Sequence, residues 1–185
     1  LGERHKIARE NILDILKTNS KFISLGGGHD YGYPDASAFV DHYKTQNIKP
    51  VVLNFDAHLD VRPTTNGFNS GTPFFRLLSE NSKDCKFAEI GIQPQCNSAH
   101  HKNWALEKGA EIFMLSDIVA KNGLMSLFDS TFFKSLTKNT KSGIASNRGS
   151  AKKISAMPSA SCCLPMLSIK LSLVRIEFCN INNIA

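Results

Sequence analysis

The sequence contains no long hydrophobic run. None of its 185 residues lies in an uninterrupted apolar stretch of about 18 residues, the length that a membrane-spanning helix needs. The first residues, LGERHKIAREN, also lack the charged-then-apolar pattern of a secretory signal. These absences argue against a helical membrane protein and against secretion. Because the chain begins with Leu rather than Met, we expect it to be processed or incomplete.

Cysteine is sparse and unpatterned. The chain has five cysteines and no C-x-x-C pair. An odd number without regular spacing does not suit the disulfide framework of a small secreted protein. We therefore expect free thiols in a reducing, cytoplasmic compartment. The five are Cys85, Cys96, Cys162, Cys163 and Cys179.

Acidic side chains are absent from residues 130–176, a serine-rich region. Residues 1–120 hold 13 Lys and Arg against 14 Asp and Glu, whereas residues 121–185 hold 9 against 2, so the net charge of +6 comes from the C-terminal part. A basic segment attracts phosphate, but residues 139–163 contain no aromatic side chain and no recognisable binding motif. We do not expect a nucleic-acid partner.

The first 120 residues alternate between helical and strand patterns. Ile12, Ile15 and Leu16 have helical spacing, and the β-branched run KPVVLNF before Asp56 is typical of a buried strand. The patterns predict helices at 5–19, 33–46, 71–81 and 97–109, and strands at 21–28, 49–58, 86–93 and 110–118. Four such alternations predict an α/β domain with a parallel sheet and a ligand site beyond the carboxyl ends of its strands.

Three polar side chains follow the strand VVLNF at a spacing of two: Asp56, His58 and Asp60. In extended chain this spacing directs them to one side. Carboxylate and imidazole ligands suit Mn²⁺, and a carboxylate can bridge two ions. A two-metal site of this kind supplies a nucleophile at neutral pH. Taken alone, a D-x-H-x-D segment is equally compatible with a solvated strand end.

A second polar segment, Gly26-Gly27-Gly28-His29-Asp30, follows the apolar stretch FISL. Three consecutive glycines indicate a tight turn or a close approach of the backbone. A G-G-x-H segment followed by D-A-H-x-D resembles the signature of the ureohydrolase superfamily of arginases, agmatinases and formimidoylglutamases. The resemblance implies an arginase-like three-layer α/β/α fold, incomplete here, with helices on both faces of a parallel sheet. It also implies a binuclear manganese cluster above the glycines.

Residues 54–78, NFDAHLDVRPTTNGFNSGTPFFRLL, resemble the formimidoylglutamase branch in particular. Arginases and agmatinases carry a histidine where this chain has Ser70 before Gly71. The resemblance covers roughly residues 20–120. It implies hydrolysis of the amidine C–N bond of N-formimidoyl-L-glutamate to formamide and L-glutamate, a step of histidine degradation. Guanidino hydrolysis of the agmatinase or arginase type is the alternative chemistry.

The resemblance also implies individual roles at this site. His29 and Asp60 would bind one Mn²⁺ ion, His58 would bind the other, and Asp56 would bridge the two. Asp56 and His58 are therefore the catalytic candidates. Asp30 is expected to orient a metal ligand from outside the coordination shell, or to cap the next segment.

Residues beyond the metal motif are candidates for contact with a small-molecule substrate. The guanidinium of Arg62 suits a substrate carboxylate, although a structural ion pair is an equal alternative. Asn69 and Ser70 lie on a loop expected to flank the substrate, where ordinary turn chemistry would also explain them. His100 and His101 are expected to be surface residues.

The likeness to the family pattern weakens after about residue 120, and the sequence diverges from it after about residue 140. The later S-x-D-x-D segment, which supplies the second bridging carboxylate and further ligands, is absent. Four of the six expected protein ligands remain. Because two divalent ions close together repel strongly without enough anionic ligands, we expect at most one ion to bind well and the chain to be inactive as given.

We therefore expect two segments: a partial arginase-like domain at 1–120 and a basic, serine-rich tail at 121–185, non-native or disordered. A reading-frame shift or a spliced-in end explains the tail, and a genuine basic appendage is the alternative. In the second case the chain would be a non-catalytic metal-binding relative. The resemblance leaves a homo-oligomer open. Loss of neighbouring strands would expose a sheet edge and favour aggregation.

Overall fold

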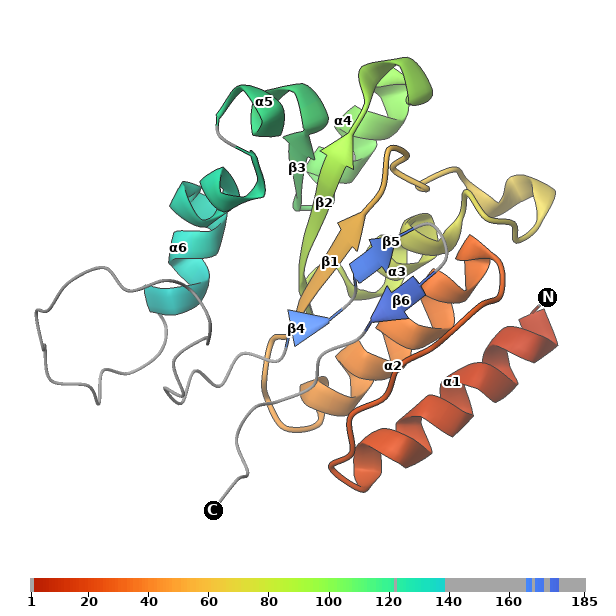
Figure 1. The fold of residues 1–185 in the computed structure, drawn as a ribbon. Helices are drawn as coiled ribbons and strands as arrows, with labels where there is room; N and C mark the ends of the chain where they lie inside the picture. Colours follow the sequence, from red (N-terminus) through yellow and green to blue (C-terminus); the bar gives the residue numbers. More distant parts are fainter. Residues whose placement is uncertain (1, 122, 139–165, 168, 172–173, 177–185) are drawn as a thin grey trace, which may run out of the picture.

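The structure, a computed structural model, describes residues 2–121, 123–138, 166–167, 169–171 and 174–176. Between residues 32 and 120 helices and strands alternate, and helices lie on both sides of a small sheet (Figure 1). The helices are α1 (Gly2–Lys17), α2 (Gly32–Lys44), α3 (Pro73–Asn81), α4 (Ala99–Glu107), α5 (Leu115–Ala120) and α6 (Thr131–Lys138). The strands are β1 (Val51–Phe55), β2 (Lys86–Ile92), β3 (Ala110–Met114), β4 (Met166–Leu167), β5 (Ile169–Leu171) and β6 (Val174–Ile176). Within these ranges no helix is both long and apolar enough to cross a membrane.

The central sheet is parallel, with the order β3-β2-β1-β4. Val51 of β1 pairs with Lys86 of β2, and the register continues to Phe55 opposite Ile90. β5 and β6 form a separate antiparallel pair. The predicted α/β class with a parallel sheet is therefore confirmed, and the carboxyl ends of β1, β2 and β3 lie at one edge.

Two hydrophobic cores lie on opposite faces of this sheet, and alternating side chains of the strands contribute to each. Val52 and Phe87 pack with α2, α3 and part of α1, whereas Val51, Leu53 and Ala88 pack with α5 and α6. Because side chains of a strand alternate between faces, one apolar run can serve both cores. Helices thus cover both faces, as expected for the three-layer arrangement (Figure 1).

The predicted strand at 21–28 is wrong: this segment is not paired with any strand in the described part of the chain. Phe22 is buried, but Ile23 is 62% exposed and Leu25 is 72% exposed. A strand requires a neighbour for its backbone N–H and C=O groups, which an apolar sequence pattern alone does not supply. The strand predicted at 110–118 is also shorter than expected, because α5 begins at Leu115.

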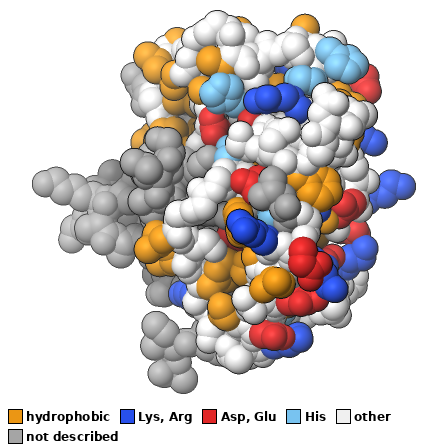
Figure 2. Space-filling view, turned by 90° about the vertical axis from the view of Figure 1, so that its right-hand side faces the viewer, with side chains coloured by type: hydrophobic (Ala, Val, Ile, Leu, Met, Phe, Trp, Pro, Cys, Tyr) orange, Lys and Arg blue, Asp and Glu red, His pale blue; other side chains and the backbone are white. Residues whose placement is uncertain are grey.

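Residues beyond the expected boundary at 120 contribute to the second core. Leu127 lies on a 3₁₀ helix, Gly123–Asp129, and Phe132, Phe133 and Leu136 lie on α6; all four are buried against the sheet. The expectations for residues 139–165 and 177–185, including Cys162, Cys163 and Cys179, lie outside the described residues. On the face in Figure 2, acidic, basic and histidine side chains are interspersed, and neither charge forms a continuous patch.

Candidate metal centre

The glycine triplet forms the loop that delivers His29. Gly26 and Gly27 have φ angles of 84° and 76°, in the left-handed region that favours glycine. Gly28 has ordinary extended backbone, but a Cβ there would overlap Asp30 Oδ1. The chain then enters a 3₁₀ helix, His29–Tyr31, that leads directly into α2. The glycines therefore allow a tight turn and make room for Asp30.

The second segment leaves β1 at Asp56. The Asp56 N–H donates to Ile90 O at 3.1 Å, so the strand pairing extends one residue beyond Phe55. The chain then turns, and Asp60 has a φ of 48°, an uncommon left-handed conformation that Asp tolerates better than most residues. This turn brings the Asp60 carboxylate, which is 7% exposed, back toward His29.

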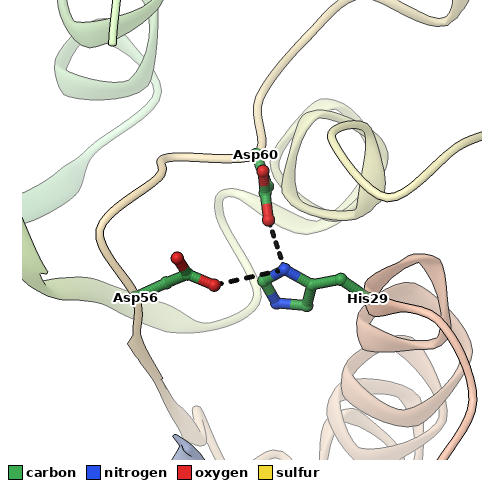
Figure 3. Close-up of side chains that lie close together, drawn as sticks. All are labelled: His29, Asp56 and Asp60. Atoms are coloured by element: carbon green, nitrogen blue, oxygen red, sulfur yellow. Dashed lines mark ion pairs between the residues drawn. The ribbon is translucent and has the colours of Figure 1, made fainter. Parts of the chain in front are cut away.

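Three side chains converge where these segments meet. One donor atom each from His29, Asp56 and Asp60 lies within 4.8 Å of the others (Figure 3). His29 Nδ1 lies 3.3 Å from Asp56 Oδ2 and contacts Asp60 Oδ2. The His29 ring also packs edge-on against Phe74 of α3, with ring centroids 5.7 Å apart. A single nitrogen thus faces two carboxylates at the carboxyl end of a parallel strand.

His58 stands outside this group of three. Its side chain is 53% exposed, and its Nδ1 lies 3.2 Å from Asp56 Oδ1. The His58 N–H donates to the same oxygen at 3.0 Å. Asp56 therefore directs one carboxylate oxygen toward His29 and the other toward His58. This is the arrangement that a bridging carboxylate requires.

Asn97 holds the turn between Asp56 and Asp60, a role that the sequence pattern did not suggest. Its Nδ2 donates to Ala57 O at 2.7 Å and to Gln93 O at 2.8 Å, and its Oδ1 accepts from the Leu59 N–H at 2.8 Å. One side chain thus satisfies three backbone groups of two loops. The position of Asn97 immediately before Ser98, the N-cap of α4, was the only local signal.

A fully buried carboxyl group lies near the centre. Glu89 of β2 accepts a 2.7 Å hydrogen bond from Asn54 Nδ2 of β1. Its second oxygen, Oε1, and Asn54 Oδ1 have no hydrogen-bond partner within the described residues. Burial raises the pKa of Glu89 well above its usual value; the Asn54 bond opposes this, and the charges of Asp60 and Asp56 add to it. The Glu89 carboxyl group therefore tends to stay protonated.

The substrate candidates lie on an exposed loop. The Arg62 N–H donates to Gly71 O at 2.8 Å, and the Arg62 side chain lies so close to Gly71 that a Cβ there would overlap it. Asn69 accepts from the Gly71 N–H at 2.9 Å through its side-chain oxygen, so it forms a turn. Ser70 is exposed. The structure thus places Arg62 next to Gly71. That Arg62, Asn69 and Ser70 contact a substrate stays a prediction.

The remaining candidates separate into surface and buried residues. His100 is exposed and His101 is half-buried on α4; burial lowers the pKa of His101, with smaller contributions from His100 and Arg62. Asp30 does not cap a helix, because no side chain caps the 3₁₀ helix His29–Tyr31 or α2. Instead its Oδ2 pairs with His5 Nε2 of α1 at 2.6 Å.

The donor set fits a divalent cation. One imidazole nitrogen and two carboxylate oxygens are ligands that Mn²⁺ accepts. The three side chains are at most 18% exposed, so water solvates their polar atoms only poorly. A cation between His29 Nδ1 and the two carboxylates would satisfy all three. With His58 on the far oxygen of Asp56, the same carboxylate can also face a second ion.

The sequence profile of the arginase family matches residues 3–135. The match covers more than half of the chain, and the chain therefore belongs to the arginase family. The resemblance to ureohydrolases, and among them to formimidoylglutamases, is confirmed by the relatives that follow.

Two curated bacterial relatives are formimidoylglutamases. That of Clostridium tetani is 34% identical over 126 residues, which cover 66% of this chain and 36% of the relative. That of Fusobacterium nucleatum is 33% identical over 119 residues, which cover 59% of this chain and 36% of the relative. The matched part of this chain thus spans about a third of the length of each relative.

Solved structures of formimidoylglutamases have the same fold. Trypanosoma cruzi formiminoglutamase with Mn²⁺ matches with a TM-score of 0.62 at 29% identity, over 70% of this chain and 43% of that one. Bacillus subtilis formimidoylglutamase matches with a TM-score of 0.63 at 24% identity, over 75% of this chain and 42% of that one. The second likeness shows the fold alone.

Proposed function

We propose that this chain carries part of the metal site of a manganese-dependent formimidoylglutamase. The observation that supports this most directly is the convergence of His29, Asp56 and Asp60 within 4.8 Å at the carboxyl end of β1. The formimidoylglutamase relatives support, as the proposed reaction, hydrolysis of the amidine C–N bond of N-formimidoyl-L-glutamate to formamide and L-glutamate.

Each side chain has a distinct part in this proposal. His29 and Asp60 would hold one Mn²⁺ ion, and Asp56, whose Oδ1 faces His58, would be shared with a second. A metal bound by these residues would supply Lewis acidity for the activation of water. Arg62 orients the substrate through a carboxylate, with its side chain supported by Gly71.

The chain by itself is proposed to bind at most one ion and to be inactive. The sequence lacks the S-x-D-x-D segment, and His58 with one oxygen of Asp56 forms a weak second site. This absence also favours a second candidate, a metal-binding relative without catalysis. Both candidates require Mn²⁺ binding at His29, and they differ in whether the bound chain recognises formimidoylglutamate.

Paramagnetic broadening tests this proposal without requiring turnover. Bound Mn²⁺ broadens the NMR lines of a small molecule held next to it. We expect the Mn²⁺-loaded chain to broaden the lines of N-formimidoyl-L-glutamate more than those of arginine or agmatine, and an Arg62→Ala variant to lose that difference. Equal broadening of all three compounds would favour the non-catalytic relative. Release of L-glutamate by the purified chain would contradict the proposed inactivity.

A further inference from the structure

A buried histidine of the first helix lies between an acidic and a basic side chain next to the metal centre. His5 of α1 is 2% exposed. Its Nε2 lies 2.6 Å from Asp30 Oδ2, and its Nδ1 lies 2.9 Å from Arg76 Nη1. A guanidinium group can only donate hydrogen bonds, so His5 Nδ1 accepts and His5 Nε2–H donates to Asp30. Both ring nitrogens are therefore committed.

Arg76, which contacts His5, is itself held by two aromatic rings. Its guanidinium carbon lies 3.4 Å from the ring centroid of Tyr33 and 3.8 Å from that of Phe68. An arginine held between two aromatic faces has little freedom to move. Because Arg76 is fixed, the His5 ring is fixed, and Asp30 is held against it.

The segment that Asp30 belongs to begins with glycine backbone. Residues 26–28 are glycines, two of them in left-handed conformation, and the backbone hydrogen bonds of the 3₁₀ helix lie after them, from the Tyr31 N–H to Gly28 O at 3.1 Å and from the Gly32 N–H to His29 O and Asp30 O. Glycine backbone does not by itself fix the direction of the following residue. His29, directly before Asp30, therefore depends on side-chain contacts for its position.

We propose that His5 is a positioning residue for the metal centre. It holds the loop at 26–31 through Asp30, so that His29 Nδ1 meets the carboxylates of Asp56 and Asp60. The inference rests on the proposed metal-binding function. A group that hydrogen-bonds a metal ligand directly typically changes metal affinity by roughly 10- to 100-fold, and because His5 acts through Asp30 we expect the lower end of that range. The alternative is a purely structural role, in which His5 only attaches α1 to the rest of the protein.

A second contact of α1 provides the matched control. Arg9 pairs with Asp41 of α2, so it also attaches α1 but does not touch the glycine loop. In the 185-residue chain, Mn²⁺ affinity is measured by electron paramagnetic resonance of the free ion. We expect His5→Leu, which retains bulk, to weaken binding about tenfold. His5→Gln, which can still donate to Asp30, recovers most of it, and Arg9→Met stays within about twofold of the unchanged chain.

The outcomes separate the two proposals. If His5→Leu folds and binds Mn²⁺ like the unchanged chain, the positioning role is refuted. If that variant does not fold, Asp30→Ala removes the same contact from the loop side. An Mn²⁺ affinity of Asp30→Ala equal to that of the unchanged chain would also refute the positioning role. If the unchanged chain binds no Mn²⁺, the proposed function fails, and metal-free hydrogen exchange decides the inference. Faster exchange at residues 26–31 in His5→Leu than in Arg9→Met supports it, and equal exchange overturns it.

Discussion

Asn54 and Glu89 face each other across the β1–β2 pair, joined by a 2.7 Å hydrogen bond from the amide to the carboxyl group. Burial raises the pKa of Glu89 well above its ordinary value of 4.5. The folded protein therefore keeps a proton that the unfolded chain releases. Without metal, the free energy of unfolding should fall as pH rises from about the unfolded pKa to the folded pKa, by at most about 1.4 kcal/mol per pH unit.

The variant Glu89→Gln should remove this pH dependence, because it retains an oxygen for Asn54 and has no proton to lose. Urea unfolding between pH 5 and 8 in the presence of a chelator measures the slope. Glu111→Gln, at an exposed position on β3, is the control and should keep the original slope. Identical slopes in the unchanged chain and Glu89→Gln would mean that Glu89 does not retain its proton.

Asn97→Ala should destabilise the protein and weaken Mn²⁺ binding together. The substitution leaves the Leu59 N–H without its partner and removes one of the two hydrogen bonds that the carbonyl groups of Ala57 and Gln93 each accept. A buried polar group without a partner costs about 1 to 3 kcal/mol, and these groups are partly buried, so we expect the lower end of that range. Urea unfolding and Mn²⁺ titration check both effects. Gln95→Ala, an exposed residue nearby, should change neither.

The sequence correctly predicted the features of the fold that depend on local residue patterns. The β-branched run in KPVVLNF and the strand pattern of KFAEIGI predicted β1 and β2, and the position of Asp56 after a buried strand predicted the place of the metal centre. Contacts between distant residues had no such signal. His5 and Asp30 are 25 residues apart, and only the spacing of His5 from Ile12 and Leu16 on the buried face of α1 hinted at its burial. The strand predicted at 21–28 was wrong because pairing depends on a neighbour rather than on composition.

Cys85 should be unreactive in the folded protein. Its thiol is buried and donates to Asn81 O at 3.4 Å, and burial raises its pKa to about 12. Because the thiolate is the reactive form, iodoacetamide at pH 8 should label the exposed Cys96 but not Cys85. Peptide mass spectrometry before and after unfolding in urea measures this. Labelling of Cys85 at the rate of Cys96 without urea would contradict its burial.

The segment at 21–25, which exposes Ile23 and Leu25, should promote association between chains. Ile23 and Leu25 are 62% and 72% exposed, and their backbone pairs with no described strand. Such backbone can pair with another chain. Ile23→Thr should therefore raise the concentration at which light scattering appears, with little change in melting temperature. Ile7→Thr, at a 50% exposed position on α1, is the matched control. If both variants raised this concentration equally, association would depend on exposed apolar surface in general rather than on residues 21–25.

The three converging side chains should differ from His58 in their effect on Mn²⁺ binding. His29→Ala removes the nitrogen that faces Asp56 and Asp60, and should weaken binding by more than the roughly 10- to 100-fold typical of an outer partner. His58→Ala should cost less, because His58 is 53% exposed and reaches only the far oxygen of Asp56. Isothermal titration of the folded variants measures both, with His100→Ala as the exposed-histidine control. If His58→Ala were the more damaging change, the principal ion would lie on the His58 side of Asp56, and the assignment of His29 and Asp60 to the stronger site would be wrong.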